Sequence, residues 1–323
     1  MGQLLKIQDY VSRYEMDLIR YTNQFVRLKK QKWQKFRENW KIEQEFGPAA
    51  LLPNEPDAGD EAPAPVLERV KHWFKKHNDE REEVPEIPAA QPHTIQFSPQ
   101  LAYFPETEAQ LKQLFLDQLF RFQLKWASST LLEEADIPAS YYFDANLKYF
   151  LQRFPDTFLL MYKPVFTLKK TVMEMETLFI TPTAVWCLKF LEDRKDAVFL
   201  GSKAHFWSKR TEKGEKKILS PMIALDRTEN IIRQILKKHG VAFPVEKGLI
   251  CRNGYIDYPD APVGLHVLDK RAYPEWFHSQ RQLRSPVKYM QLKAAQLFMN
   301  ECLSAGAIHK TGEHDEEPQR DGE

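Results

Sequence analysis

Apolar runs and turn residues through residues 158–192 predict a β-meander. The segment FLLMYKPVFTLKKTVMEMETLFITPTAVWCLKFLE is interpreted as two strands, a tight turn at Thr181-Pro182-Thr183 and a third strand. Short apolar runs bounded by turn residues are typical of buried strands. Glu176 opens the second strand and Lys189 lies on the third. The pattern therefore places one acidic and one basic residue within an otherwise apolar sheet.

Helical periodicity surrounds this meander. Pro105-Glu106-Thr107 introduces a long helix, with Thr107 and Gln110 at capping-box spacing, and a second helix covers about 143–153. After the meander, Ser220-Pro221 opens a helix that runs to about Lys238, and residues 245–252 form a strand. Between the meander and this helix, we expect short strands at 197–200 and 204–207 and a charged turn at 209–217. Helices before a hairpin, followed by a helix and a strand, indicate an α/β fold.

The first 46 residues are rich in Lys, Arg and aromatic residues and predict two helices, at about 7–20 and 24–45. On the second helix, Phe25, Trp33 and Phe36 recur near helical spacing while basic residues occupy the remaining positions. Such a helix either contacts phosphates and bases, or buries its aromatic stripe and leaves the lysines in solvent. The periodicity favours packing. The same helices could also recruit a protein partner.

Composition divides the rest of the chain. Residues 47–93 form a Pro-rich and acidic linker with one charged helix at about 66–83, residues 94–308 form the main α/β domain, and residues 309–323 form an acidic tail. Segments 47–64 and 309–323 carry too little apolar surface to offset the entropy of ordering, so disorder is expected there.

Charge and cysteine content argue against several classes of protein. The 323 residues carry a net charge of +1, so any attraction to nucleic acid must come from local patches. The three cysteines are widely spaced and form no C-x-x-C pair, which argues against a disulfide framework or zinc site. No apolar run reaches the length of a membrane span, and the amino terminus lacks a signal-peptide pattern. We expect a cytoplasmic protein that does not interact with membranes.

The meander resembles the nuclease-related domain (NERD) family of the PD-(D/E)xK nuclease superfamily. The resemblance rests on Glu174-Met175-Glu176, the Ile180-Thr181-Pro182 turn and the apolar strand Val185–Leu188. Further along, Trp207, Ser220-Pro221 and the strand at 248–251 follow in the family's order, so the resemblance covers roughly residues 140–260. It implies a restriction-endonuclease-like mixed sheet flanked by helices, here with an N-terminal helical extension. It also implies Mg²⁺-dependent phosphodiester hydrolysis with Glu176 as the metal-binding acid.

The chain departs from this pattern at the reacting positions. Aligned on Pro182, Lys189 stands where the family has its second carboxylate, and Leu191 stands where it has its lysine. The family's glutamine is also missing, since Ala224-Leu225 occupies that region. Glu176 and Lys189 are therefore the candidate catalytic residues of a degenerate site, with Mg²⁺ bound if the site is active. The alternative is a structural salt bridge between them.

Other residues could restore a site or bind the substrate. The replacement acids considered are Glu192, Glu133, Glu134 and Asp144, and the replacement lysines are Lys163, Lys169 and Lys170. Glu192 should point to the opposite sheet face from Lys189. A candidate surface for DNA or RNA comprises Lys163, Lys169, Lys170, Arg281, Arg284 and Lys288, although a solvated helix face gives the same pattern. The sequence thus predicts a weak or inactive nuclease that binds nucleic acid, and the alternative is a non-enzymatic interaction scaffold.

Overall fold

A computed structural model describes residues 1–46, 96–130, 135–168, 171–193, 195–283 and 285–305. The chain forms two compact units. The first comprises Met1–Arg27 and the chain from Leu116 onward, and the second comprises Leu28–Phe115. The predicted linker and its helix at 66–83, as well as the predicted acidic tail, lie outside the described residues.

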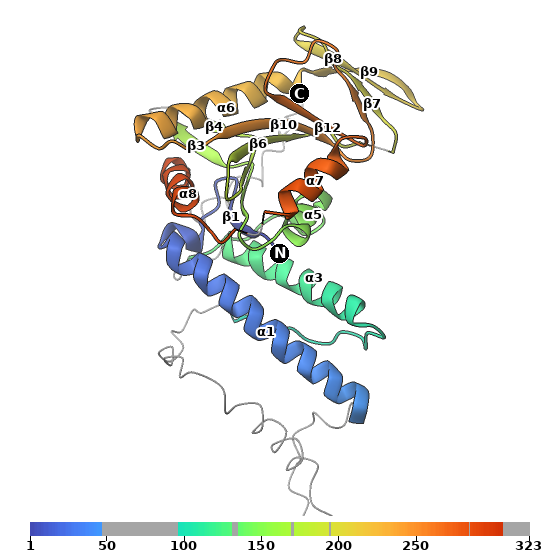
Figure 1. The fold of residues 1–323 in the computed structure, drawn as a ribbon, viewed down its shortest axis with the longest axis vertical. Coiled ribbons are helices and arrows are strands. Elements are labelled where there is room, and N and C mark those ends of the chain that lie inside the picture. Colours follow the sequence, from blue (N-terminus) through green and yellow to red (C-terminus); the bar gives the residue numbers. More distant parts are fainter. Residues whose placement is uncertain (47–95, 131–134, 169–170, 194, 284, 306–323) are drawn as a thin grey trace, which may run out of the picture. The chain divides into compact units, whose positions relative to one another are not determined.

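A six-stranded mixed sheet forms the centre of the first unit (Figure 1). Its strands, in spatial order, are β1 (Gln3–Ile7), β2 (Leu159–Tyr162), β5 (Thr177–Ile180), β6 (Val185–Phe190), β10 (Val245–Cys251) and β12 (Leu265–Asp269). Only β5 runs antiparallel to its neighbours; all the other pairs in the sheet are parallel. Five strands therefore end at one border of the sheet, which we call the carboxyl edge.

Helices cover both faces of this sheet. Helix α6 (Pro221–Lys238) crosses one face over β6 and β10, and α8 (Tyr289–Glu301) packs beside α6. On the other face lie α5 (Ala145–Arg153) and α7 (Tyr273–Arg281) (Figure 1). The prediction of an α/β domain with a mixed sheet between helices is confirmed at this level of detail.

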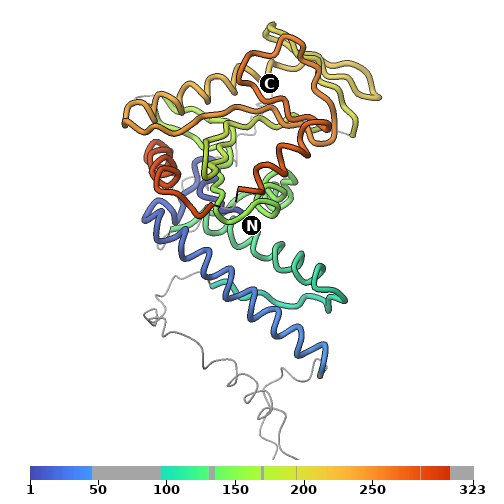
Figure 2. The backbone as a smooth tube through the Cα atoms, viewed as in Figure 1, coloured from blue at the N-terminus to red at the C-terminus, as the bar shows by residue number. Residues whose placement is uncertain are grey.

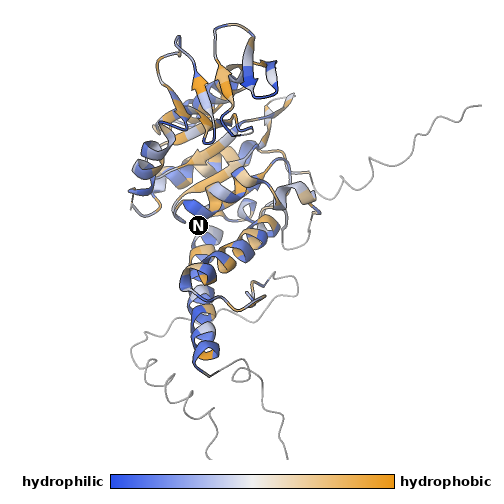
Figure 3. Cartoon of the chain, turned by 90° about the vertical axis from the view of Figure 1, so that its right-hand side faces the viewer, coloured by the Kyte–Doolittle hydropathy of each residue, from blue (hydrophilic) through white to orange (hydrophobic). Residues whose placement is uncertain are grey.

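Aromatic side chains dominate the core under α5 and α7. Phe150, Phe154 and Phe179 are each at most 2% exposed, and their rings lie 4.7–5.5 Å apart. Trp186 and Trp276 extend the same cluster, with ring centroids 5.4 Å apart. In Figure 3 the strands of the central sheet are mostly hydrophobic, as expected for strands covered on both faces.

Two smaller sheets complete the first unit. The strands β3 (Val165–Leu168) and β4 (Thr171–Glu174) follow β2 and precede β5 in the sequence, and they form a separate antiparallel pair. A four-stranded sheet has the order β11 (Tyr255–Asp257), β7 (Val198–Leu200), β8 (Phe206–Thr211) and β9 (Gly214–Leu219). Its β8–β9 hairpin extends beyond the central sheet (Figure 2).

The hairpin corrects one prediction. Residues 209–217, predicted as a charged turn, are mostly strand, and the reversal lies between Thr211 and Gly214. Gly214 has φ of +114°, a conformation that favours glycine. The many lysines obscured the strand signal because their side chains project from an exposed sheet and give no apolar alternation.

The predicted helix at residues 7–20 is wrong. Residues Gln3–Ile7 form β1, a short 3₁₀ helix covers Arg13–Glu15, and one long helix, α1, runs over Leu18–Phe46. Strand β1 pairs in parallel with β2, and Leu4, Leu5 and Ile7 are fully buried. Pairing with a strand about 155 residues away overrides local helix propensity, and local periodicity cannot reveal it.

Helix α1 buries its aromatic stripe, as the packing interpretation predicts. Within the first unit, the Phe25 ring lies 6.3 Å from that of Trp126. Within the second unit, Trp33 lies 5.2 Å from Phe115, and the indole N–H of Trp40 donates to the Pro105 carbonyl at 2.8 Å. The aromatic residues of this helix therefore pack internally, and recruitment of a protein partner through it stays a prediction.

Several predicted helix ends are confirmed. Helix α3 (Glu108–Trp126) begins after Thr107, whose hydroxyl accepts from the backbone N–H of Gln110 at 3.3 Å. The Gln110 side chain in turn accepts from the Glu106 backbone at 2.9 Å. Helix α6 begins at Pro221 and is followed by Gly240 with φ of +62°. Caps and turn residues act locally, which is why the sequence locates them well.

Asp269 fixes the turn from β12 into α7. Its carboxylate is 2% exposed and accepts from the Arg271 backbone N–H at 2.9 Å and from the Arg271 side chain. Burial alone would raise the pKa of this carboxyl. The hydrogen bonds from Arg271 and from the backbone of Ile256 and Ala272 outweigh burial and hold the pKa below its ordinary value.

Replacing Asp269 with asparagine should lower the free energy of unfolding by about 1–3 kcal/mol at pH 7. Because the folded-state pKa is depressed, the ionised carboxylate stabilises the fold above its unfolded pKa of about 3.9. That stabilisation is lost as the pH falls through the folded pKa. Urea unfolding of both proteins between pH 7 and pH 3 should show the gap narrowing toward low pH. An equal gap at every pH would contradict this assignment.

Candidate functional site

Glu176 and Lys189 face each other across the antiparallel strands β5 and β6. Thr177 pairs with Leu188, so the residues just outside that pair, Glu176 and Lys189, lie opposite one another at the carboxyl edge. The Lys189 ammonium donates to the Glu176 carboxylate at 2.7 Å, and the two side chains are 32% and 11% exposed. The Glu176 backbone N–H donates to the Thr228 hydroxyl of α6 at 3.0 Å. The predicted ion pair therefore forms, while a catalytic role for either residue stays a prediction.

A second ionic network lies beside this pair, between α6 and β10. The Lys247 ammonium lies 2.7 Å from Asp226 and 2.8 Å from Glu229, and Arg233 lies 2.9 Å from Glu229. Burial would raise the pKa of the Glu229 carboxyl, but hydrogen bonds from Lys247 and Arg233 hold it below the ordinary value. Burial would lower the pKa of Lys247, and Asp226 and Glu229 raise it instead. Sequence reasoning missed this network because its members are spread over two elements.

The arrangement does not fit a divalent metal ion. A magnesium site needs carboxylate oxygens with surplus negative charge, since Mg²⁺ is bound through acidic oxygens and water. Here three carboxylates (Glu176, Asp226 and Glu229) are balanced by three cations (Lys189, Lys247 and Arg233). In the part of the chain that the structure describes, no group of three or more His, Cys, Asp or Glu residues could hold a metal ion. We therefore assign no metal-dependent step to Glu176.

The replacement acids proposed from the sequence have other partners. Glu192 pairs with Arg252, whose guanidinium also donates to Asn146 of α5 at 2.6 Å, so Glu192 lies on the α5 face as predicted. Asp144 caps α5 by accepting from Asn146 and Leu147, each at 3.0 Å. Glu133 and Glu134 lie outside the described residues. Neither described acid completes a site around Glu176.

The candidate nucleic-acid residues lie on separate elements. Lys163 follows β2 at the carboxyl edge, and its ammonium lies 5.5 Å from the Tyr162 ring centroid. Arg281 ends α7 with its guanidinium over Phe277, and Lys288 is the exposed N-cap residue of α8. Lys169, Lys170 and Arg284 lie outside the described residues. Of the candidate nucleic-acid residues that the structure describes, only Lys163 follows a strand that ends at the carboxyl edge.

Next to Lys163, the carboxyl edge carries a feature that the sequence did not indicate. Gln8 and Lys163 follow the paired strands β1 and β2, and both have positive φ, of 40° and 47°. Two adjacent non-glycine residues in the left-handed region store backbone strain, which concentrates at functional sites. Beside them, the hydroxyl of Tyr162 donates to Asp144 at 2.6 Å, and burial raises the pKa of Tyr162. No sequence signal reports φ, so this feature emerges only from the fold.

Comparison with known proteins gives one match. The chain is 31% identical over 128 residues to an RNA 2′,3′-cyclic phosphodiesterase of Geobacillus stearothermophilus. The match covers 38% of this chain and 36% of that protein, so the chain spans little more than a third of its relative's length. No family model and no solved structure matches the chain.

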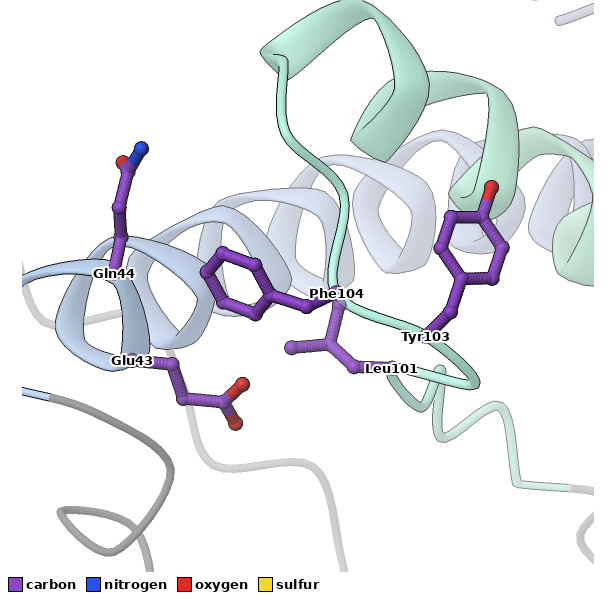
Figure 4. A pocket seen from close by; sticks show the side chains of 5 residues that line it. All are labelled: Glu43, Gln44, Leu101, Tyr103 and Phe104. Carbon is purple, nitrogen blue, oxygen red and sulfur yellow. The ribbon is translucent and has the colours of Figure 1, made fainter.

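The second unit contains a pocket of about 380 Å³ near the end of α1 (Figure 4). Leu101, Tyr103 and Phe104 line it from one segment, and Glu43 and Gln44 line it from α1. The Tyr103 and Phe104 side chains are 55% and 47% exposed. Among the described residues that line it, Glu43 and Tyr103 are the ionisable ones, and these supply no nucleophile with an adjacent base.

Among the described residues, no helix is both long and apolar enough to cross a membrane.

Replacing Lys189 with methionine should lower the free energy of unfolding by about 1–3 kcal/mol, because a nearly buried carboxylate loses its partner. Urea unfolding at pH 7 measures the change. The matched control is Lys270→Met, since Lys270 lies the same 2.7 Å from Asp196 but both side chains are about half exposed. The control should cost much less, because exposed ion pairs contribute little to stability. Equal losses of unfolding free energy in the two variants would show that the Glu176–Lys189 pair stabilises the fold no more than an exposed ion pair does.

Proposed function

We propose that this protein binds RNA through a nuclease-like sheet whose metal site has been replaced by ion pairs. The observation that carries the proposal is the Glu176–Lys189 pair, 2.7 Å apart, at the carboxyl edge of the sheet. In open α/β sheets, ligands bind outside the carboxyl ends of the strands. A cation at the second acidic position of a metal site favours contact with phosphate and disfavours binding of a metal ion.

The order of elements supports a restriction-endonuclease-like core. Helix α5 is followed by the antiparallel strands β2, β5 and β6, then by the crossover helix α6 and by β10 parallel to β6. Trp207 lies on β8, Pro221 begins α6 and residues 248–251 lie on β10, and this order supports the proposed core.

The match to an RNA 2′,3′-cyclic phosphodiesterase supports RNA as the substrate class. It covers a minor part of both proteins, so the first proposal takes from it the type of polymer alone. With a net charge of +1, the chain must bind RNA through local basic surfaces and not through an overall field.

Fluorescence anisotropy with a labelled 20-nucleotide single-stranded RNA tests the proposal. We expect saturable binding at 50 mM salt that weakens steeply by 200 mM, by about 20-fold for three phosphate contacts. Heparin, a polyanion without bases, serves as a competitor, and bovine serum albumin as a non-binding protein control. An absence of binding at 50 mM salt would overturn the proposal and favour the interaction scaffold.

A second candidate function follows from the same match, namely hydrolysis of a 2′,3′-cyclic phosphate end. Such hydrolysis needs a positioned acid and base near the phosphate. Among the described residues, the His266 ring lies 3.1 Å from Glu246, but this pair lies toward the opposite end of β10 from the carboxyl edge. An oligonucleotide ending in a cyclic phosphate, followed by chromatography, distinguishes this activity from binding alone.

A further inference from the structure

The β8–β9 hairpin exposes an apolar pair on one of its faces. Phe206 and Leu219 lie directly opposite each other in register, and their side chains are 59% and 62% exposed. Side chains two residues further along share the same face, so Ser208 pairs with Lys217 next to them. A large aromatic side chain left in solvent beside a lysine is a candidate binding surface.

The hairpin is strongly basic in a chain that is nearly neutral. Between Phe206 and Leu219 there are five Lys or Arg residues and two Glu residues. Glu215 pairs with Arg210 at 2.9 Å, and Asp193 pairs with Lys209. In the described ranges of the chain, no carboxylate pairs with the exposed side chains of Lys213, Lys216 and Lys217. This positive charge is therefore available to a ligand.

The opposite face of the hairpin fixes its orientation. Trp207 is 1% exposed, and its ring lies 4.8 Å from that of Tyr258. The indole N–H of Trp207 donates to the Ser202 carbonyl at 2.9 Å. Because Trp207 is anchored inward, Phe206 and Ser208 are held outward, and the exposed face is preformed.

We propose that this outer face, formed by Phe206, Leu219 and Lys217 with Lys213 in the turn beside it, is a docking surface for single-stranded RNA. Unpaired bases stack on exposed aromatic rings, and lysines contact the phosphates between them. The choice of RNA as the ligand rests on the proposed function. The exposed Phe206 ring and the exposed lysines are observed in the hairpin independently of that function. A further protein strand is disfavoured as the occupant, since lysines on the edge strand β9 oppose strand addition.

Anisotropy titrations of the full chain with single-stranded and duplex RNA test this surface. Phe206→Ala should weaken binding of single-stranded RNA by about 5- to 100-fold and leave binding of the duplex nearly unchanged, because paired bases cannot stack on the ring. Lys217→Glu should weaken binding and lower the salt slope by about one phosphate contact. The controls are Phe143→Ala, at an 81% exposed ring outside the hairpin, and Lys237→Glu on α6. Circular dichroism should show native folding in all four variants.

The outcomes separate this inference from the proposed function. If the wild-type chain binds RNA and both hairpin variants bind like the controls, the docking surface is elsewhere and RNA binding stands. If the wild-type chain does not bind RNA, both proposals fall. If the chain is a dimer in solution and Lys217→Glu makes it a monomer, a second copy occupies the surface and the inference is overturned.

Discussion

Replacing Phe154 with alanine should lower the free energy of unfolding by about 3–5 kcal/mol, because the core around it cannot close over the missing ring. Phe154 is 1% exposed. The centroid of its ring lies 4.7 Å from that of Phe179 and 5.2 Å from those of Phe150 and Phe277. Each aromatic pair adds about 0.5–1.5 kcal/mol beyond the apolar area that it buries. Urea unfolding followed by tryptophan fluorescence measures the loss.

The matched control for this core is Phe143→Ala. The Phe143 side chain is 81% exposed, so the same chemical change there should alter stability by no more than about 0.5 kcal/mol. If both variants lose the same stability, the aromatic cluster under α5 and α7 does not form the core of the unit.

Replacing Glu15 with alanine should destabilise the protein by a similar amount, about 3–5 kcal/mol, because it leaves a buried ammonium without its charge partner. Lys6 lies on the edge strand β1 with its side chain fully buried, and it pairs with Glu15. Its ammonium also donates to the Ser304 hydroxyl at 2.7 Å, and that hydroxyl in turn donates to Glu15 at 2.7 Å. The pair thus joins the first strand to the end of the described chain.

A double variant separates lost charge pairing from lost packing. Lys6→Met combined with Glu15→Ala removes both charges and should recover most of the stability lost in Glu15→Ala alone. Glu215→Ala is the exposed control, since its pair with Arg210 is about half exposed and exposed ion pairs contribute little to stability. A double variant as unstable as Glu15→Ala would show that the buried ammonium is not the cause.

Elements defined by local signals were predictable from the sequence. The α3 cap at Thr107, the α6 start at Pro221 and the turn around Pro182 depend on residues within a few positions of one another. Strand β1 was not predictable, because its partner β2 lies more than 150 residues away and its pattern resembles a helix. The β8–β9 hairpin was missed because its exposed lysines give no apolar alternation.

Only the part of the candidate site that depends on local register was predictable from the sequence. The Glu176–Lys189 pair follows from the hairpin register alone, since the turn fixes which residues face each other. Its neighbours Asp226, Glu229 and Lys247 depend on how α6 crosses the sheet, which no local pattern reports. For the same reason the sequence could not show that the site is balanced in charge.

Incubation of labelled single-stranded RNA with saturating protein, in Mg²⁺ or Mn²⁺, tests whether the Glu176–Lys189 site binds RNA without cleaving it. On a denaturing gel, we expect intact RNA under conditions where anisotropy shows that the RNA is bound. The ion pair holds Lys189 against Glu176, the carboxylate that would have to bind the metal. Metal-dependent cleavage by the wild-type chain that is abolished in Glu176→Ala would contradict the account.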